Sequence, residues 1–267
     1  MGQICFMGYA LPMLRTVLLE KRLGETPLEA LTAWKTANPE YQDIPASYAG
    51  RLDPMASGAL LILLGDECRK QKEYTGLDKE YEIEVLLDVG SDTGDILGLT
   101  VEAGVITTPT DEQITGVLKR EVGTSIVPYP VYSSKTVAGK PLFLYALEGT
   151  LNTITIPTHE ETIYSIKLRS TAEVSSEHLR KQVEGLLKKV PTSEEPSKKL
   201  GANFRIDAVK ESWNEVFSAP SRAYVVLALT VSCGSGTYMR SLASRIGEQL
   251  DTRALALSIH RTRVGLT

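Results

Sequence analysis

The carboxylate of Asp53 is the side chain of this sequence best placed to do chemistry. Asp53 precedes Pro54, and a proline pushes the backbone of the residue before it toward an extended conformation. Gly50 and Gly58 permit tight turns on either side, and the apolar run at 59–64 fits a buried strand. A carboxylate held at a rigid bend beside a buried strand can carry chemistry. Asp53 can equally serve only as a turn or cap residue, and the local sequence leaves both interpretations open.

Two further side chains, Tyr81 and Arg240, could act together with a carboxylate. Tyr81 falls on the apolar face of the alternating stretch 79–88, where a core aromatic is the plainer interpretation. Arg240 falls in the first turn of a helix that opens with Gly-Ser-Gly-Thr, where a positive charge opposes the helix dipole. A partner such as Asp53 or a phosphate would explain that position, and an arginine beside Asp53 would favour the ionised carboxylate. A solvated surface arginine is the alternative.

Periodicity predicts the elements that must position these side chains. Residues 79–88 alternate between apolar and acidic side chains, which is typical of an antiparallel strand with one exposed face. Helices are expected at 26–38, 110–121, 176–188 and 237–250 and after a cap at Asp207, and strands at 59–64, 79–88, 160–169, 223–233 and 257–264. Strands and helices mix without regular βαβ alternation. We therefore expect an α+β fold with a mixed, mainly antiparallel central sheet flanked by helices.

Length and composition restrict the class of protein. The chain has 267 residues, of which 42% are hydrophobic, so we expect one domain over residues 1–267 with a polar, mobile loop at 190–203. No apolar run is long enough to span a membrane. The three cysteines are too scattered for a disulfide framework or a zinc site, so we expect no metal and a reducing compartment, the cytoplasm. The net charge of −4 argues against an RNA-binding protein, although a local basic surface can still hold phosphates.

Five parts of the sequence, in this order, resemble the motifs of one enzyme family. They are Gly50–Gly58 (GRLDPMASG); Lys79–Tyr81 with Gly90–Asp95; Val127–Lys135; Cys233–Leu242; and His260–Gly265. Together they are similar to the TruB family of tRNA pseudouridine-55 synthases. The resemblance implies a pseudouridine synthase-like fold and the isomerisation of uridine to pseudouridine in RNA, without cofactor. It implies uridine 55 in the T loop as the target and the T arm of tRNA as the partner.

The implied reaction breaks the N1–C1′ bond of uridine, rotates the base and rejoins it through C5. The first step develops positive charge on the sugar, which a carboxylate can stabilise or trap. By resemblance, Asp53 is the nucleophile, Tyr81 stacks on the target base and can serve in proton transfer, and Arg240 completes the catalytic set. Whether Asp53 attacks the sugar or the base stays open.

The resemblance also implies substrate-binding residues, some at positions where the chain departs from the family. Tyr132 and Lys135 match a segment that lines the family's cleft, and Lys21 belongs to the N-terminal motif. Tyr48 stands where the family usually has histidine, and Arg51 creates a Gly-Arg-Leu-Asp pattern similar to that of ribosomal-RNA pseudouridine synthases. Such an enzyme is therefore an alternative, as is a non-catalytic RNA-binding folding chaperone. We expect a monomer without the C-terminal PUA domain common in the family.

Overall fold

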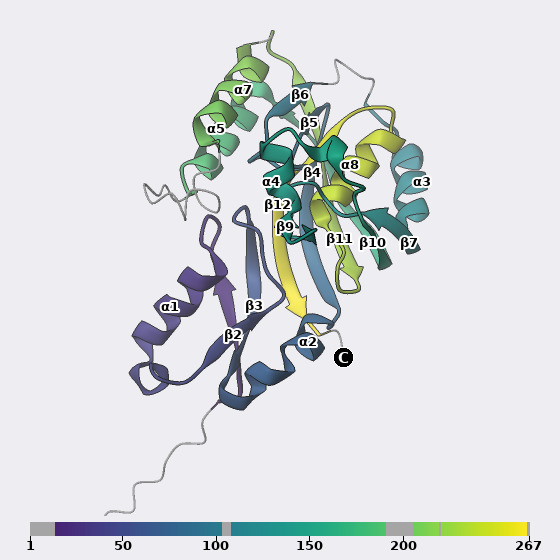
Figure 1. Cartoon of the computed structure of the whole chain (residues 1–267). Helices are drawn as coiled ribbons and strands as arrows, with labels where there is room; N and C mark the ends of the chain where they lie inside the picture. The colour runs from purple at the N-terminus through teal and green to yellow at the C-terminus, as the bar shows by residue number, and fades with distance from the viewer. Residues whose placement is uncertain (1–13, 103–107, 191–204, 219, 266–267) are drawn as a thin grey trace, which may run out of the picture.

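The computed structural model describes residues 14–102, 108–190, 205–218 and 220–265; apart from Val190, the loop expected at 190–203 lies outside them. An eight-stranded sheet runs through the molecule in the order β1-β3-β12-β4-β11-β10-β7, with β2 paired to β3 (Figure 1). Its strands are β1 (Thr16–Lys21), β2 (Ala46–Ala49), β3 (Ala56–Leu64), β4 (Lys79–Leu87), β7 (Gly123–Pro128), β10 (Thr158–Ser175), β11 (Ala223–Cys233) and β12 (Ala254–Val264). Only β3 and β12 are parallel among these paired strands. The expected mixed, mainly antiparallel sheet is confirmed.

Helices pack along the sheet and at its ends (Figure 1). The longer helices are α1 (Pro27–Ala37), α3 (Asp111–Glu121), α5 (Ser176–Leu187), α7 (Ile206–Ser218) and α8 (Met239–Gln249). The shorter elements are α2 (Gln71–Thr75), α4 (Leu142–Leu147), the 3-10 turns Pro39–Tyr41, Gly65–Lys70 and Leu151–Thr153, and the strand pairs β5 (Val89–Ser91) with β6 (Thr100–Glu102) and β8 (Thr136–Val137) with β9 (Lys140–Pro141). None of the helices in the described ranges is long and apolar enough to cross a membrane.

The burial of β4 follows the predicted alternation. Tyr81, Ile83 and Val85 are buried, whereas the glutamates between them are only half-buried. Because β4 lies between β12 and β11, its buried face runs along the middle of the sheet. Tyr81 is thereby fixed by a central strand and not by a loop.

Several predicted boundaries differ from the structure. The last helix begins at Met239 instead of 237, and α7 begins at Ile206, so Asp207 lies within its first turn and does not cap it. Leu28, which its spacing places on the apolar face of α1, is 62% exposed. The helix packs through Ala30 and Leu31 instead. Strand β10 is also longer than expected and covers 158–175.

The hydrophobic core of the described residues has two parts, and the cleft described below takes apolar wall residues such as Leu52, Tyr81 and Ile259 from the larger one. The larger part joins β4, β11 and β12 to helices α3, α5, α7 and α8, and it includes the fully buried Trp213, whose Nε1 donates to the carbonyl of Ile96 at 3.0 Å. The smaller part lies under α1 and includes Leu60 and Ile62 of β3. Strand β3 contributes residues to both parts and begins at Ala56, three residues after Asp53.

Candidate active site

A cleft of about 490 Å³ brings together residues from distant parts of the chain. The three expected catalytic residues, Asp53, Tyr81 and Arg240, all line it. Arg51 and Tyr132, two of the expected substrate-binding residues, line it as well. These residues come from the loop before β3, from β4, from the first turn of α8 and from the segment after β7.

Arg240 is paired with Asp53 and is not a solvated surface residue. Its Nε lies 2.8 Å from Oδ2 of Asp53 and 3.4 Å from Oδ2 of Asp95. Its other nitrogens donate to the carbonyls of Thr93 at 2.8 Å and Tyr132 at 3.4 Å. Burial lowers the pKa of Arg240, but the charges of Asp53 and Asp95 outweigh burial and raise it. The Arg240 side chain is 6% exposed and that of Asp53 46%, so the buried cation orients a carboxylate that a substrate can reach.

Asp95 is a site residue that the sequence analysis did not single out. It is 4% exposed, and its Oδ1 accepts from the hydroxyl of Thr93 at 2.7 Å and from the amide of Leu97 at 2.9 Å. Burial raises the pKa of Asp95, while the charge of Arg240 opposes that shift. The signal available was its place in the motif-like segment 90–95. Asp95 completes an Asp53–Arg240–Asp95 arrangement in which one guanidinium balances two carboxylates.

Lys21 lies beneath the Asp53 turn and not on the cleft wall. The amide of Ala56 donates to the carbonyl of Asp53 at 3.0 Å, which closes the turn. Lys21 is fully buried, and its Nζ donates to the carbonyls of Ala56 at 2.5 Å and Arg22 at 3.0 Å. Burial lowers its pKa to about 8. This placement does not support the expected substrate contact; Lys21 holds the turn that carries Asp53.

Gly58 allows β12 to approach the same turn closely. Its φ is +105°, and a Cβ at this position would lie 2.2 Å from the carbonyl oxygen of Arg261, its partner on β12. A side chain at this contact would push the two strands apart. With the strands together, Arg261 is 1% exposed and donates to the carbonyls of Ala59 at 2.7 Å and Gly50 at 3.0 Å. Arg261 thus anchors both ends of the segment that contains Asp53, a role that the sequence analysis missed.

Tyr81 fits both interpretations offered by the sequence. It is 8% exposed and belongs to the hydrophobic core, yet it also lines the cleft. Burial raises the pKa of the Tyr81 phenol, so the ring is neutral near pH 7. A neutral ring in the cleft wall can stack on a base, and its hydroxyl can hold a proton.

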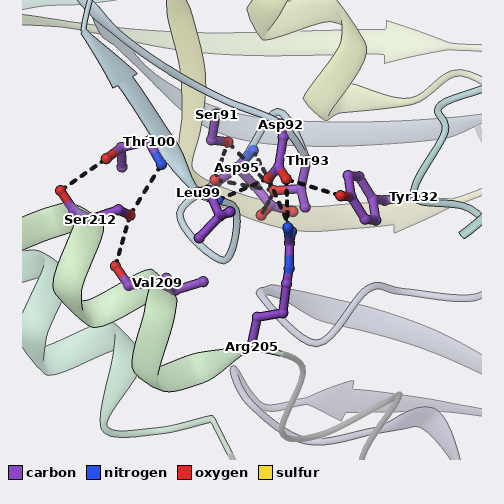
Figure 2. Close-up of polar contacts among 10 residues, drawn as sticks. All are labelled: Ser91, Asp92, Thr93, Asp95, Leu99, Thr100, Tyr132, Arg205, Val209 and Ser212. Carbon is purple, nitrogen blue, oxygen red and sulfur yellow. Dashed lines mark hydrogen bonds and ion pairs between the residues drawn. The ribbon is translucent and has the colours of Figure 1, made fainter. Parts of the chain in front are cut away.

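Tyr132 is held at the cleft by a polar network (Figure 2). Its hydroxyl donates to Oδ2 of Asp92 at 3.0 Å. Arg205 pairs with Asp92 through two contacts of 2.7 and 3.1 Å, and its guanidinium lies 4.8 Å from the centre of the Tyr132 ring. Asp92 also accepts from the amide of Leu99 at 2.8 Å. The network connects the start of α7 to the loop that carries Asp95.

Two expected substrate-binding residues lie beside the cleft and not in it. Lys135 places its Nζ 4.6 Å from the centre of the Tyr129 ring and is not a wall residue of the cleft. Tyr48 lines a neighbouring groove of about 580 Å³ near α1, which shares Gly50 and Arg51 with the cleft. Tyr48 therefore lies in a groove next to the cleft and does not line the cleft itself.

The net charge of the side chains that line the cleft is positive, whereas the net charge of the whole chain is negative. Its described walls carry four basic side chains (Arg51, Lys79, Arg240 and Arg261) and two carboxylates (Asp53 and Asp95), whereas the net charge of the chain is −4. An excess of positive charge in a concave site attracts anions locally, whatever the total charge. Within the described ranges, no group of three or more His, Cys, Asp or Glu side chains could hold a metal ion.

Comparisons with known proteins point in the same direction as this geometry. The sequence model for "TruB family pseudouridylate synthase (N terminal domain)" matches residues 41–185. The tRNA pseudouridine synthase B of Ralstonia pickettii is 28% identical over 250 residues, which cover 93% of this chain and 62% of that protein. The tRNA pseudouridine synthase 4 of Saccharomyces cerevisiae is 27% identical over 247 residues, which cover 82% of this chain and 60% of that protein. The chain thus spans about three-fifths of the length of these relatives.

Solved structures share the fold. A chain from the crystal structure of a Cbf5-Nop10-Gar1 complex superposes with a TM-score of 0.54 at 18% identity, covering 94% of this chain and 48% of that one. At this identity the likeness concerns the fold alone. It supports the α+β assignment, with a central mixed sheet, made from the sequence.

Proposed function

This chain belongs to the TruB family of pseudouridylate synthases, and from that premise we propose that it isomerises uridine to pseudouridine in RNA, with Asp53 as the nucleophile. The observation that carries the proposal is the pairing of a half-exposed Asp53 with a buried Arg240 in a cleft that Tyr81 also lines. The arginine holds the carboxylate in place on the cleft wall. An ionised carboxylate can trap or stabilise the sugar centre when the base leaves.

The remaining parts of the cleft support this chemistry. The target nucleotide must leave its stack to enter the cleft, at a cost of a few kcal/mol. Tyr81 offers a ring for the extruded base to stack on, and Tyr132, which also lines the cleft, is fixed by its hydrogen bond to Asp92. RNA recognition of this kind depends on shape, phosphate contacts and stacking. The basic excess of the cleft supplies the electrostatic part.

The substrate proposed is uridine 55 in the T arm of tRNA, acted on by a monomer in the cytoplasm. Both relatives compared above are named tRNA pseudouridine synthases. Arg51 supports the alternative, a ribosomal-RNA enzyme, because it is exposed on the cleft wall and gives the Gly-Arg-Leu-Asp pattern. Arg51 is a single side chain, whereas the similarity to the tRNA enzymes extends over most of the chain, so we propose tRNA as the substrate.

Tritium release from RNA labelled at C5 of uridine tests the reaction, and chemical mapping of the product tests the position. We expect release from an unmodified tRNA transcript and from an isolated T-arm hairpin, with kcat/KM values within about tenfold of each other, or about 1.4 kcal/mol. Release from ribosomal RNA with an inert hairpin would overturn the substrate assignment. Tight RNA binding with no release from any RNA would favour a folding chaperone.

A further inference from the structure

Two buried cations, Lys79 and Arg261, line the cleft. Lys79 and Tyr81 lie two residues apart on the buried face of β4, and Arg261 is the register partner of Tyr81 on β12. Lys79 is 5% exposed and Arg261 1%, and both line the cleft. Lys79 Nζ donates to the carbonyl of Thr75 at 2.6 Å, and Arg261 donates to the backbone carbonyls of Ala59 and Gly50. Among the described residues, neither cation forms a salt bridge.

Two such charges are unfavourable without an anion. Burying a cation is costly unless it is paired, and backbone carbonyls supply only part of the compensation. Burial, followed by the charge of Arg261, lowers the pKa of Lys79 to about 8. Arg240 differs, since two carboxylates balance it. Lys79 and Arg261, beside Tyr81, therefore form a part of the cleft that can bind a negatively charged group entering from outside.

We propose that Lys79, backed by Arg261, binds a carbonyl oxygen of the target uracil and stabilises the negative charge that the base acquires during the reaction. The inference rests on the proposed function and adds a catalytic residue to it. Preorganised charges aimed at the atom where charge develops are among the largest sources of catalysis.

Both possible routes place negative charge on the base. If the N1–C1′ bond breaks first, its electron pair leaves with N1 and delocalises onto O2 and O4, while the Asp53 carboxylate bonds to C1′. C5 then attacks C1′ and displaces the carboxylate, C5 loses its proton and N1 gains one, so the product is an isomer of the substrate. If Asp53 instead adds to C6, the electrons of the C5–C6 double bond move onto O4. A cation beside the base assists either route.

The burial of the two cations favours the base over a backbone phosphate as their ligand. A phosphate of the RNA chain stays hydrated and meets exposed side chains such as Arg51 at the edge of the cleft. Lys79 and Arg261 lie beside Tyr81 on the sheet itself. Only a group inserted into the cleft reaches them, and an extruded base is such a group.

Single-turnover rates and RNA affinities of Lys79→Met and Lys79→Arg test the inference, with Lys119→Met, an exposed lysine on α3, as the matched control. For Lys79→Met we expect the rate at saturating RNA to fall about 100-fold, the typical effect of one lost donor, with Kd within twofold of wild type. Lys79→Arg should recover at least a tenth of the wild-type rate, and Lys119→Met should equal wild type. If Lys79→Met does not fold, as judged by circular dichroism, Lys79→Gln takes its place.

A second substrate separates charge stabilisation from a structural role. In 5-fluorouridine the fluorine disperses the negative charge that develops on the base, so the base depends less on an external cation. The fall in rate caused by Lys79→Met should therefore be at least threefold smaller with this base than with uridine. The reaction is followed by the formation of the rearranged or covalently bound fluorinated base. An equal loss for both bases, or a saturated rate unchanged in Lys79→Met, overturns the inference. A higher Kd with an unchanged saturated rate assigns Lys79 to a phosphate and also overturns it. A wild-type protein that forms no pseudouridine refutes the proposed function itself, which is a distinct result.

Discussion

The floor of the cleft (Asp53, Asp95, Lys79, Arg240 and Arg261) and its rim (Arg51 and Lys135) are built in different ways. On the floor, Arg240 is 6% exposed and makes four contacts with fixed partners, including Asp53. At the rim, Arg51 is exposed, and Lys135 contacts the ring of Tyr129. Floor groups are in place before the substrate arrives, which favours stabilisation of the reacting atoms. Rim groups must be ordered by the RNA, so we expect them to govern affinity and substitutions on the floor to govern rate.

The largest expected effect comes from Asp53→Asn. The amide keeps the shape of the carboxylate but has neither its charge nor its nucleophilicity, so we expect pseudouridine formation to be abolished. RNA affinity should change by no more than about 1–2 kcal/mol, since the floor contributes little to binding. Tritium release and filter binding measure the two quantities. Appreciable turnover by the pure variant would remove Asp53 from the mechanism.

Arg240→Met should affect both stability and rate. Removing one partner of a buried ion pair costs about 3–5 kcal/mol, because Asp95 is left buried without its cation. We expect the free energy of unfolding to fall by that amount and the single-turnover rate by about 100-fold or more. Urea unfolding and single-turnover kinetics provide the measurements.

The double variant Arg240→Met/Asp95→Asn is the control for that prediction. It removes the buried negative charge together with its partner, so part of the stability should return through coupling between neighbouring residues. The rate should stay low, because Asp53 still lacks the guanidinium that orients it. Recovery of the rate together with the stability would show that Arg240 acts only through folding.

The pH dependence of kcat/KM tests the charge state of the floor. Burial and the neighbouring Arg261 lower the pKa of Lys79 from 10.5 to about 8, while Cys233 and Asp78 oppose that shift. The protonated amine is the active form, so kcat/KM should decline as pH rises above about 8. Lys79→Arg should abolish this decline, because guanidinium stays protonated throughout the range.

Lys21 is the competing explanation for such a decline, because burial lowers its pKa to about 8 as well. It lies beneath the Asp53 turn and bonds to Ala56, so its deprotonation would act through the position of the turn. A decline that persists in Lys79→Arg would assign the profile to Lys21 or another group.

The sequence predicted two residues of the floor, Asp53 and Arg240, but missed three others, for a physical reason. Asp53 and Arg240 belong to motif-like segments of fixed local geometry, and the unfavourable position of Arg240 in a first helical turn already indicated a partner. Lys79 and Arg261 were not recognised as site residues, because their roles depend on the pairing of β3, β4 and β12, and Asp95 was missed because it reaches the site through a bridge to Ala256 of β12. Local periodicity does not encode that pairing.

The same limit applies to the lysines and to Leu28. Lys21 was expected from the family resemblance to bind substrate, yet pairing of β1 with β3 places it under the Asp53 turn. Leu28 satisfies helical spacing but remains exposed beside the groove near α1. Helix and strand types followed local signals such as the capping box at Thr26. The burial of individual charged residues followed tertiary contacts that only the folded chain brings together.

The smallest expected effect concerns the rim and comes from Arg51→Ala. Binding of the proposed RNA should depend on salt despite the negative net charge, with a slope of log affinity against log salt steeper than about −2, because several phosphates must be neutralised. Loss of one phosphate contact should reduce the magnitude of that slope by about 1. The saturated rate should stay unchanged, because Arg51 is exposed and does not belong to the buried network around Arg240. Lys119→Ala, on the exposed face of α3, is the matched control and should keep the wild-type slope. An unchanged slope with a reduced rate would move Arg51 from the rim to the floor, and the division between affinity and catalysis would then have to be drawn elsewhere.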